Sequence, residues 1–472
     1  MMLTRRSFSA SWLASMLGAS PPSDTPARHR ARKRFREIAA SLYAWDLLDE
    51  GVAGPLDTLA DTARVNSAYL VALMHWEKRP LTDFFYPHNP KRKTYFPEDS
   101  RAYWKPNPEH YRDTRIKPLV SEREELRGTD WLELLVAEAR KRGWKTGAEI
   151  SHTVLDTERA RGEFRDVVQR DIWGNPIGQV ICVNNPDARN YLFGLFTDVV
   201  KNYDLDFVQT CLVPFAHGRH AVSLGAGGDE HEPGTFGYKT WGSRSADPLL
   251  AVLETALGGC FCPGCHAAAR KEGLDLEAVR RAMRPLADAL DGATPAGAHS
   301  VAKLRGSNTS GTAVLLRHPE MFDWLRFRCD AMTGTFRDIL AAVRAVKPGI
   351  DLRLNAYIYD FPELAGLDFA ALRPHLGSIR SSNYDEQSGR AERLEHKRQF
   401  LLSVRAGAGD EIHFLSAIGV RPRATPELIR GGVLISSECG ADGLSLGHYD
   451  GAPLRNLEAI GEGLREADVT VG

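Results

Sequence analysis

Carboxylate and histidine side chains recur in this sequence within or directly after short apolar runs, near the points where buried strands are expected to end. They are Asp46, His75, Glu77, Glu149, Asp385, Glu386, His448 and Asp450. Paired carboxyl groups can exchange protons or attack carbon, and carboxylates beside histidines can bind a divalent metal ion. Any one of them could instead cap a helix or pair with a loop arginine. Their recurrence at so many strand ends exceeds what a purely structural scaffold requires.

Eight β-prone runs, each followed by a longer amphipathic segment, predict the elements that position these side chains. The runs occupy residues 38–45, 68–76, 145–152, 206–213, 351–359, 377–383, 412–419 and 443–449. Helices are expected at residues 130–142, 186–203, 319–346, 425–439 and 453–467. This α/β alternation predicts a closed (β/α)8 TIM barrel with long insertions after strands 2 and 4, at residues 79–128 and 214–350. A doubly wound open sheet is the alternative, but it often carries a glycine-rich phosphate fingerprint that is absent here.

The active site of a barrel forms at the carboxyl ends of its strands, so these polar side chains are expected to share one face. Hydrolysis of a glycoside needs two carboxyl groups that flank the scissile bond, one as acid and the other as nucleophile or base. The candidates are Asp46, Glu149, Asp385, Glu386 and Asp450. Asp385 is preferred because it follows the sixth strand among polar neighbours.

Sugar rings present apolar faces that stack on flat side chains, so aromatic and polar residues near the strand ends are expected to bind the substrate. The expected substrate-binding residues are Trp45, His75, Glu77, Asn355, Tyr357, Arg380, Tyr384 and His448. The first hypothesis is therefore a glycosidase that acts on an oligo- or polysaccharide and needs no cofactor for its chemistry.

Two other functions fit the same residues. In the first, His75, Glu77, Glu149 and Asp385 bind a divalent ion in a metal-dependent sugar isomerase, epimerase or lyase. In the second, the barrel binds carbohydrate without catalysis. Loss of activity with a chelator would favour the metal-dependent enzyme, and tight sugar binding without turnover would favour the binding protein.

The N-terminus and the overall charge indicate where the protein acts. Residues 1–22 are typical of a twin-arginine signal peptide, because Arg5 and Arg6 precede a short apolar stretch and then small residues. Residues 23–34 form a basic linker, and residues 35–472 form the barrel domain. No stretch approaches the ~20 apolar residues that a membrane helix needs. We therefore expect the twin-arginine export machinery to deliver a periplasmic or secreted protein.

The 472 residues include 60 Lys and Arg against 61 Asp and Glu, so no net field favours a polyanion. Nucleic acid is therefore not an expected partner. The seven cysteines are too few to define the fold through disulfides.

Three of these cysteines, Cys260, Cys262 and Cys265, form a C-x-C-x-x-C run that His266 follows. Such close spacing suits tetrahedral binding of a structural zinc ion, with a fourth ligand from His266 or from a distant residue such as Cys211. A disulfide between Cys262 and Cys265, or buried free thiols, are the alternatives.

Several short motifs resemble those of TIM-barrel glycoside hydrolases found in exported bacterial proteins. The resemblance covers about residues 36–470 and rests on four segments, at residues 43–46, 184–189, 203–206 and 260–265. The cysteine run is similar to the zinc-binding segment of family 42 β-galactosidases, in which an upstream cysteine completes the site. Cys211 is the nearest counterpart, so the resemblance implies Cys211, Cys260, Cys262 and Cys265 as zinc ligands.

The catalytic residues of that clan cannot be carried over. Its retaining members have an acid/base Glu at the end of strand 4 and a nucleophilic Glu at the end of strand 7. Here residues 209–213 are Gln-Thr-Cys-Leu-Val and residues 416–420 are Ser-Ala-Ile-Gly-Val. Neither segment contains a carboxylate, so any glycosidase chemistry must use a different pair.

Overall fold

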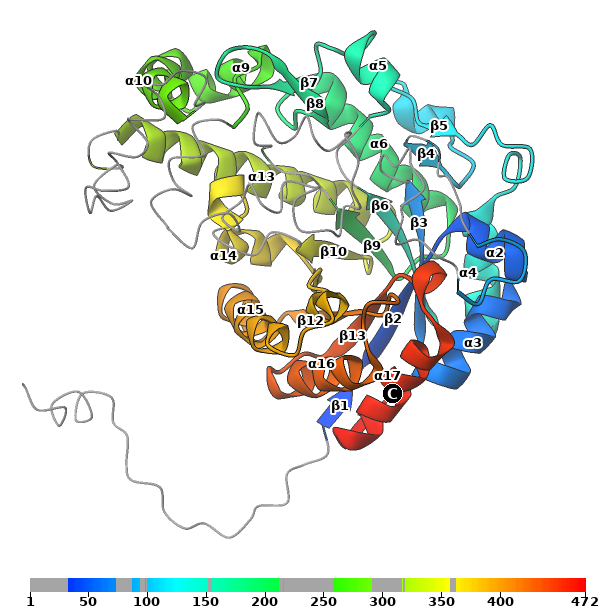
Figure 1. Cartoon of the computed structure of the whole chain (residues 1–472). Helices are drawn as coiled ribbons and strands as arrows, with labels where there is room; N and C mark the ends of the chain where they lie inside the picture. Colours follow the sequence, from blue (N-terminus) through cyan, green and yellow to red (C-terminus); the bar gives the residue numbers. More distant parts are fainter. Residues whose placement is uncertain are drawn as a thin grey trace, which may run out of the picture.

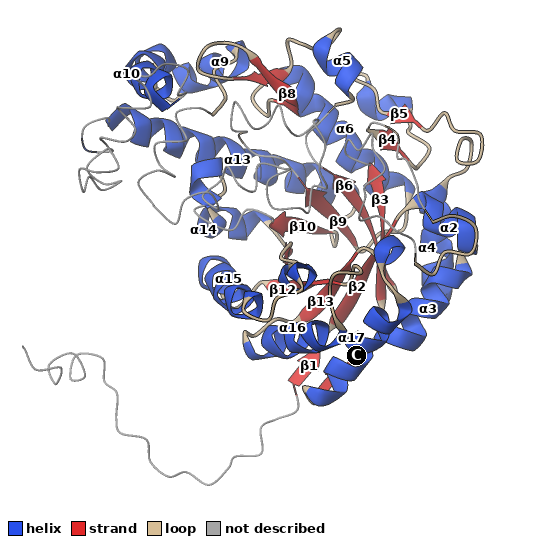
Figure 2. Ribbon diagram, viewed as in Figure 1, coloured by secondary structure: helices blue, strands red, loops and turns tan. Residues whose placement is uncertain are grey.

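The fold is a closed barrel of eight parallel strands enclosed by helices (Figures 1 and 2). The computed structural model describes residues 33–73, 87–93, 98, 100–151, 155–211, 215, 258–290, 316, 319–356 and 362–472. The barrel strands are β2 (Glu37–Leu42), β3 (Ser67–Leu73), β6 (Lys145–Ser151), β9 (Phe207–Cys211), β10 (Asp351–Ala356), β11 (Ser378–Ser381), β12 (His413–Gly419) and β13 (Gly443–Gly447). Each pairs in parallel with the next, and β13 pairs with β2. All eight predicted strands and the TIM-barrel fold are confirmed.

Helices surround the barrel and extend beside it (Figure 1), and several of them begin at a capping side chain. They are α2 (Ala44–Glu50), α3 (Ala53–Ala63), α4 (Trp131–Lys141), α5 (Thr157–Arg161), α6 (Pro186–Asn202), α9 (Pro263–Lys271), α10 (Leu276–Leu290), α13 (Pro319–Val346), α14 (Phe369–Leu372), α15 (Arg393–Ala408), α16 (Pro426–Glu438) and α17 (Leu454–Glu466). Asp130, Asn185 and Thr425 accept backbone hydrogen bonds at the starts of α4, α6 and α16. The five predicted helices are therefore present with ends shifted by at most one residue.

Short elements lie outside the barrel wall. The edge strands are β4 (Arg101–Ala102) and β5 (Leu119–Val120), the hairpin consists of β7 (Val168–Arg170) and β8 (Pro176–Ile181), and β1 (Lys33–Phe35) pairs with β14 (Val469–Val471). The 3-10 turns are η1 (Pro108–Tyr111), η5 (Pro362–Ala365), η6 (Arg373–His375), η7 (Asp385–Ser388) and η8 (Tyr449–Gly451). Within the described residues, no helix is long and apolar enough to cross a membrane.

The first predicted strand ends earlier than its apolar pattern suggests. The run was expected to continue to Trp45, but β2 stops at Leu42 and α2 begins at Ala44. The Asp46 carboxylate accepts a hydrogen bond of 2.8 Å from the backbone N–H of Tyr43, which starts the helix at this point. Trp45 and Asp46 therefore lie in the first turn of α2, at the mouth of the barrel.

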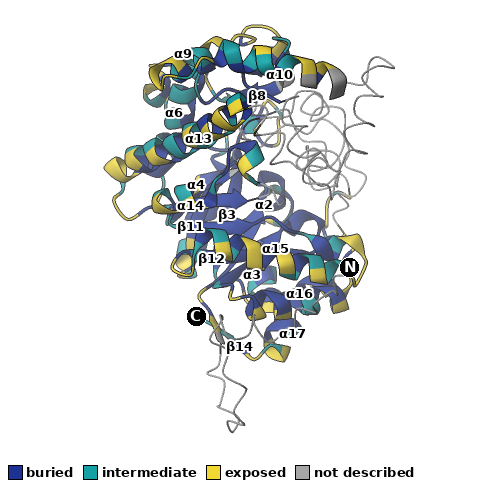
Figure 3. Ribbon diagram, turned by 90° about the vertical axis from the view of Figure 1, so that its left-hand side faces the viewer, coloured by how far each residue is buried: buried dark blue, intermediate teal, exposed yellow. Residues whose placement is uncertain are grey.

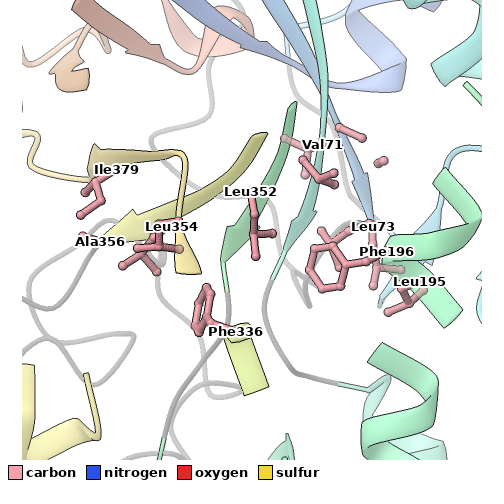
Figure 4. Packing of buried hydrophobic residues seen from close by; sticks show 14 of the residues in the cluster. Val71, Leu73, Leu195, Phe196, Phe336, Leu352, Leu354, Ala356 and Ile379 are labelled. Carbon is pink, nitrogen blue, oxygen red and sulfur yellow. The ribbon is translucent and has the colours of Figure 1, made fainter. Parts of the chain in front are cut away.

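Side chains alternate between the lumen and the helical layer, as the pleat of a strand requires. Outward-facing Leu352 and Leu354 of β10 belong to the same buried cluster as Phe336 of α13 and Leu195 and Phe196 of α6 (Figure 4). Figure 3 shows that the strands are buried while the outer faces of the helices are exposed. The inward-facing residues alternate with these and divide the lumen into layers.

An ion network occupies the amino-terminal end of the lumen. Glu37 accepts contacts from Arg353 at 3.0 Å, His413 at 3.0 Å and Lys145 at 3.3 Å, and the side chains of Glu37 and Arg353 are only 0% and 1% exposed. Burial alone would raise the pKa of Glu37, but the charge of Arg353 above all, with the His413 hydrogen bond and the charge of Lys145, holds that pKa well below its usual range. The carboxylate is therefore charged at neutral pH.

An apolar layer of Ala39, Tyr69, Phe207 and Leu415 separates this network from the mouth of the barrel. Above it, polar side chains share the inward-facing positions with Val71 and Ala417: they are Ser41, Glu149, Gln209, Asn355, Arg380 and Ser445. The amino-terminal end of the lumen therefore contains an ion network whose charges neutralise one another. The polar side chains above the apolar layer form a surface that we call the polar floor.

Replacing Glu37 by Gln is predicted to lower the free energy of unfolding by about 3 kcal/mol at pH 7. The reason is that breaking the buried ion pair leaves the charge of Arg353 with only the more distant Asp351 carboxylate, at 3.7 Å. Urea denaturation measures this change. Glu109→Gln, at a side chain that is 79% exposed, is the matched control and should leave the midpoint unchanged.

The pH dependence of the stability of the wild type and Glu37→Gln tests the same ion network a second time. Because the folded-state pKa of Glu37 is depressed, its stabilisation is present above about pH 4.5 and is lost as the pH falls below that value. The wild-type chain should therefore lose stability in acid more steeply than Glu37→Gln. Parallel pH profiles would contradict the assigned network.

Candidate functional site

Two buried carboxyl groups lie together at the mouth of the barrel, where β2 and β13 are neighbours. Asp46 is in the first turn of α2, Asp450 is in η8, and they are 1% and 2% exposed. Asp46 uses Oδ2 to cap its own helix, while no described residue donates a hydrogen bond to its Oδ1. Asp450 Oδ1 accepts a hydrogen bond of 2.7 Å from the Gly451 N–H. Helix capping therefore accounts for only one oxygen of Asp46.

The electrostatics of Asp46 are unusual for a capping residue. Burial raises its pKa well above the usual range, and the charge of Asp450 adds to this, followed by those of Glu50 and Asp49 on the same helix. Asp46 therefore holds a proton at a pH where an exposed aspartate is ionised. A protonated carboxyl group beside a second carboxyl group is the arrangement that general acid–base chemistry needs.

Aromatic rings form a wall beside the two carboxyl groups. Tyr43 stacks on Trp45 with ring centroids 4.4 Å apart, and His448 stacks on the other side of Tyr43 at 5.2 Å. Tyr103 meets Trp45 edge-on at 6.1 Å. The ring of His448 is held by Ser41, whose Oγ is 2.7 Å from Nδ1. Tyr43 and Trp45 are 0% exposed and Tyr103 is 2% exposed, so these rings pack against one another beside the carboxyl pair. Aromatic rings next to polar groups are the kind of side chain that binds the face of a sugar ring.

The polar floor lies beneath this pair of carboxyl groups. Gln209 donates a hydrogen bond to Glu149, so this carboxylate faces the lumen rather than a helix. Arg380 donates to Asn355 at 2.7 Å and to Ser445 at 2.8 Å, and it also donates to the hydroxyl of Tyr384. Burial alone would lower the pKa of Arg380, but Tyr384, Tyr69 and Glu149 raise it above its usual range. The floor thus presents a charged guanidinium and a carboxylate to the mouth.

Asp385, the preferred catalytic candidate from the sequence, is instead surrounded by partners of its own. Its two oxygens contact Arg393 at 2.6 Å, His396 at 2.7 Å and the Asn383 amide at 2.9 Å. Although burial would raise its pKa, His396, Asn383 and Arg393 lower it. An ionised carboxylate held in this way fastens η7 onto α15, and it lacks the raised pKa that a catalytic acid needs.

Glu386 is likewise engaged in packing between helices. It contacts Lys397 at 2.9 Å, with both side chains 0% exposed, and it accepts a hydrogen bond from the Gly419 N–H. A Cβ at Gly432 of α16 would lie 2.2 Å from its Oε1, so Glu386 sits against that helix. Burial raises its pKa, but its position between helices separates it from the mouth of the barrel.

The structure thus brings together Trp45, Asp46, His448 and Asp450 at the mouth, and Glu149, Asn355, Arg380 and Tyr384 at the floor. His75, Glu77 and Tyr357 lie outside the described residues. Glu149 and Asp385 do not support the divalent-ion site that was predicted from His75, Glu77, Glu149 and Asp385. Gln209 donates a hydrogen bond to Glu149, and Arg393 and His396 bind Asp385.

Four cysteines form a compact cluster beside the barrel. The Sγ atoms of Cys182, Cys260, Cys262 and Cys265 all lie within 4.8 Å of one another, and all four residues are buried. The described cysteines are free thiols, and Cys262 and Cys265 are not joined by a disulfide. Four thiolates in this arrangement fit the tetrahedral donor set of a structural zinc ion.

Backbone and side-chain contacts preorganise this cluster. Cys182 directly follows β8, and Cys262 caps the start of α9. The Arg170 N–H donates to the Cys260 sulfur at 3.2 Å, and the Asn184 amide donates to Cys265 at 3.4 Å. A bound ion would join the β7–β8 hairpin to α9, which is a structural role rather than a catalytic one.

The fourth thiol differs from the sequence-based expectation. The cluster contains Cys182 where Cys211 was expected, and the side chain of Cys211 lies outside the described residues. His266, the other expected ligand, contacts Glu277 at 3.4 Å instead. Cys182 stands alone in the sequence, and only the fold of the β7–β8 hairpin brings it to the other three.

Sequence analysis also missed several residues around the pair. Asp49 and Glu50 follow Asp46 by three and four positions. This spacing places the three acidic residues on one side of a helix, so the sequence pattern alone could have indicated them. His88, Asn89 and Arg92 contact them from the insertion after β3, and no local pattern marks those three residues.

Comparisons with known proteins identify the fold. No family model and no curated protein matches the chain. Among solved structures, the PgaB (BpsB) glycoside hydrolase domain from Bordetella bronchiseptica is 14% identical, with a TM-score of 0.51 over 92% of this chain and 99% of that domain. A β-galactosidase from Halorubrum lacusprofundi is 13% identical, with a TM-score of 0.51 over 91% of this chain and 58% of that one.

An α-L-fucosidase isoenzyme 2 from Paenibacillus thiaminolyticus is 14% identical, with a TM-score of 0.50 over 92% of this chain. The chain spans about half the length of that fucosidase, of which it covers 49%. At such identities the likeness shows that these proteins share the barrel fold, while function depends on the residues of the site.

Replacing Cys182 by Ser is predicted to abolish tight metal binding, because three thiolates cannot close a tetrahedral site. Elemental analysis of the purified chain should find about one zinc ion per wild-type chain and much less in the variant. The thermal unfolding midpoint of Cys182→Ser should fall below that of the wild type. Cys439→Ser is the matched control, since this buried cysteine lies outside the cluster, and equal metal content in both variants would contradict the site.

Proposed function

We propose that this chain is a glycoside hydrolase that acts on an oligo- or polysaccharide outside the cytoplasm, with Asp46 and Asp450 as its catalytic pair. The observation that carries the proposal is the buried Asp46 carboxyl group, whose pKa is raised beside Asp450 at the carboxyl end of the barrel. The rings of Tyr43, Trp45 and His448 stack beside the pair, and aromatic groups of this kind are the ones that bind the faces of sugar rings. The similar solved structures carry glycosidase names, which agrees with this assignment.

In this mechanism the protonated Asp46 donates its proton to the glycosidic oxygen as the bond from that oxygen to the anomeric carbon breaks. Asp450 either attacks the anomeric carbon or removes a proton from the attacking water. In the first case water later releases the sugar from Asp450, and Asp46 takes up the proton of that water. The configuration of the released sugar, followed by NMR, distinguishes the two routes.

The floor of the site positions the substrate in this proposal. The Arg380 guanidinium and the Asn355 amide are already joined by a hydrogen bond of 2.7 Å, and both can bind sugar hydroxyls. Glu149 lies nearby as an acceptor, oriented by Gln209. The thiolate cluster takes no part in bond breaking, because a closed tetrahedral site leaves no open position on its metal.

Export by the twin-arginine route completes the proposal. The paired arginines at positions 5 and 6 and the apolar stretch after them support it. That route moves folded proteins, so a zinc ion at the cysteines can be bound before export.

The catalytic pair is tested with Asp46→Asn and Asp450→Asn, assayed on a panel of aryl glycosides and oligosaccharides. Each variant should lose a factor of at least about 100 in kcat, because each lacks one proton-transfer or nucleophilic group. Asp385→Asn should keep most of its kcat and lose stability instead, since its carboxylate binds Arg393 and His396. Turnover should persist when a chelator is present during the assay.

Other outcomes would overturn the assignment. Full activity in Asp46→Asn, or loss of activity confined to Asp385→Asn, would show that the pair lies elsewhere. Loss with a chelator would favour the metal-dependent isomerase, epimerase or lyase. Tight sugar binding without turnover by the wild-type chain would favour a carbohydrate-binding barrel.

The export proposal is tested by replacing Arg5 and Arg6 together with lysine. Because the receptor recognises the arginine pair, the variant should remain in the cytoplasm while the wild-type chain is exported. Cell fractionation and immunoblotting measure the distribution. Equal export of both chains would contradict the twin-arginine assignment.

A further inference from the structure

A short segment of the insertion after β3 joins the two elements that carry Asp46 and Asp450. This segment, residues 87–93, contacts α2 on one side and the loop after β13 on the other. It comes from neither element, and its contacts are made by side chains rather than by a continuous sheet. These contacts identify residues that act on the carboxyl pair from outside it.

Arg92 makes the strongest of these contacts. Its Nε lies 2.6 Å from Asp49 Oδ2, and its Nη2 donates to Oδ1 at 2.8 Å, so the pair is bidentate. The Asp49 side chain is 0% exposed, and Asn89 donates a further hydrogen bond of 3.0 Å to it. The Oδ1 of Asn89 in turn accepts the backbone N–H groups of Lys91 and Arg92, which fixes the segment locally.

His88 completes the connection on the other side. Its Nδ1 donates to the Ala452 carbonyl at 2.6 Å, and its ring meets that of Tyr449 at 4.8 Å. The Tyr449 hydroxyl donates to Glu50 of α2 at 2.8 Å. Segment 87–93 therefore spans from Asp49, three residues after Asp46, to the residues on either side of Asp450.

We propose that Arg92 is a positioning residue for the Asp46–Asp450 pair. It holds α2 in place, and it neutralises the negative charge of Asp49, which lies three residues after Asp46. The inference rests on the proposed function for its catalytic consequence. Its physical basis is that residues three apart on a helix are neighbours, so the charge of Asp49 acts on Asp46 unless a cation is bound to it.

The charged groups around Asp46 come from several elements. They are Asp49 and Glu50 on α2, Asp450 in η8, Arg421 packed against Gly451, His448, and His88, Lys91, Arg92 and Lys93 on the segment, with Glu125 behind Arg92; Lys91 donates to the Leu48 carbonyl of α2 at 3.1 Å. Arg92 is the cation that binds the helix carrying Asp46 through two hydrogen bonds. Burial lowers the pKa of His88, which keeps its ring neutral at neutral pH, and Arg92 is the cation of this segment that the structure shows bound to the Asp49 carboxylate.

The test compares Arg92→Met, Asp49→Asn and the double variant Asp49→Asn/Arg92→Met in kcat and kcat/KM from pH 4 to 9. Arg92→Met should raise the pH of the alkaline limb by about one unit, because the unpaired Asp49 carboxylate disfavours ionisation of Asp46. Asp49→Asn should shift the limb in the opposite direction. The double variant should return close to the wild-type limb, since both charges are then absent.

Arg112→Met is the matched control, because Arg112 belongs to the same insertion and is 74% exposed. It should leave the pH profile unchanged. If Arg92→Met loses stability while its alkaline limb stays at the wild-type pH, Arg92 has a purely structural role, and the proposal is overturned. A double variant whose alkaline limb stays as far from that of the wild type as the limb of Arg92→Met does would also overturn it.

A stability arm keeps this inference separate from the proposed function. Because Asp46 has a raised pKa in the folded chain, its ionisation opposes folding, so the stability of the wild type relative to Asp46→Asn falls with rising pH and levels off at that pKa. In the Arg92→Met background, the levelling should occur about one pH unit higher. If the chain hydrolyses no glycoside, this shift still supports the role of Arg92, and its absence overturns it.

Discussion

The pairing of β13 with β2 is the interaction on which the rest of the structure depends. It closes the barrel and sets Gly443 opposite Glu37 and Leu446 opposite Ala40, although these residues are about 400 positions apart. A Cβ at residue 443 would lie 2.0 Å from the Glu37 carbonyl oxygen, so only glycine allows the two strands to approach this closely. Everything placed after the two strands, including Asp46 and Asp450, becomes adjacent through this register.

The closed lumen then separates two electrostatic environments. At the amino-terminal end, Glu37 is surrounded by Arg353, His413 and Lys145 and stays ionised. At the carboxyl end, burial raises the pKa of Asp46, and the charge of Asp450 adds to this. The apolar layer around Tyr69 and Phe207 lies between them. The same kind of side chain therefore stabilises the fold at one end and is available for proton transfer at the other.

The sequence predicted the barrel well because its signals are local. Apolar runs of strand length and capping residues such as Asn185 and Thr425 depend on nearby residues only. The site was harder, because the state of a carboxyl group depends on distant partners. Asp385 and Asp450 both follow strands among polar residues, yet only the structure shows that Arg393 and His396 bind the former. Cys182 is a similar case, since its relation to Cys260 appears only in the folded hairpin.

The insertion after β3 shows how an appended segment can act on a site built by the barrel. His88 and Arg92 contribute no group to the proposed reaction, yet they contact both elements that bear the carboxyl pair. Such an arrangement lets the barrel keep its regular βα units while the loop adjusts the charge around them. It also explains why two adjacent acidic residues, Asp49 and Glu50, can be tolerated beside Asp46 in one helix turn.

The most direct measurement is a crystal structure of Asp46→Asn soaked with an oligosaccharide from the assay panel. A sugar ring is expected at the mouth beside Tyr43 and Trp45, with the glycosidic oxygen within hydrogen-bond distance of residue 46 and the anomeric carbon facing Asp450. A sugar bound beside Asp385, or on an outer face of the barrel with the mouth empty, would show that Asp46 and Asp450 are not the catalytic pair.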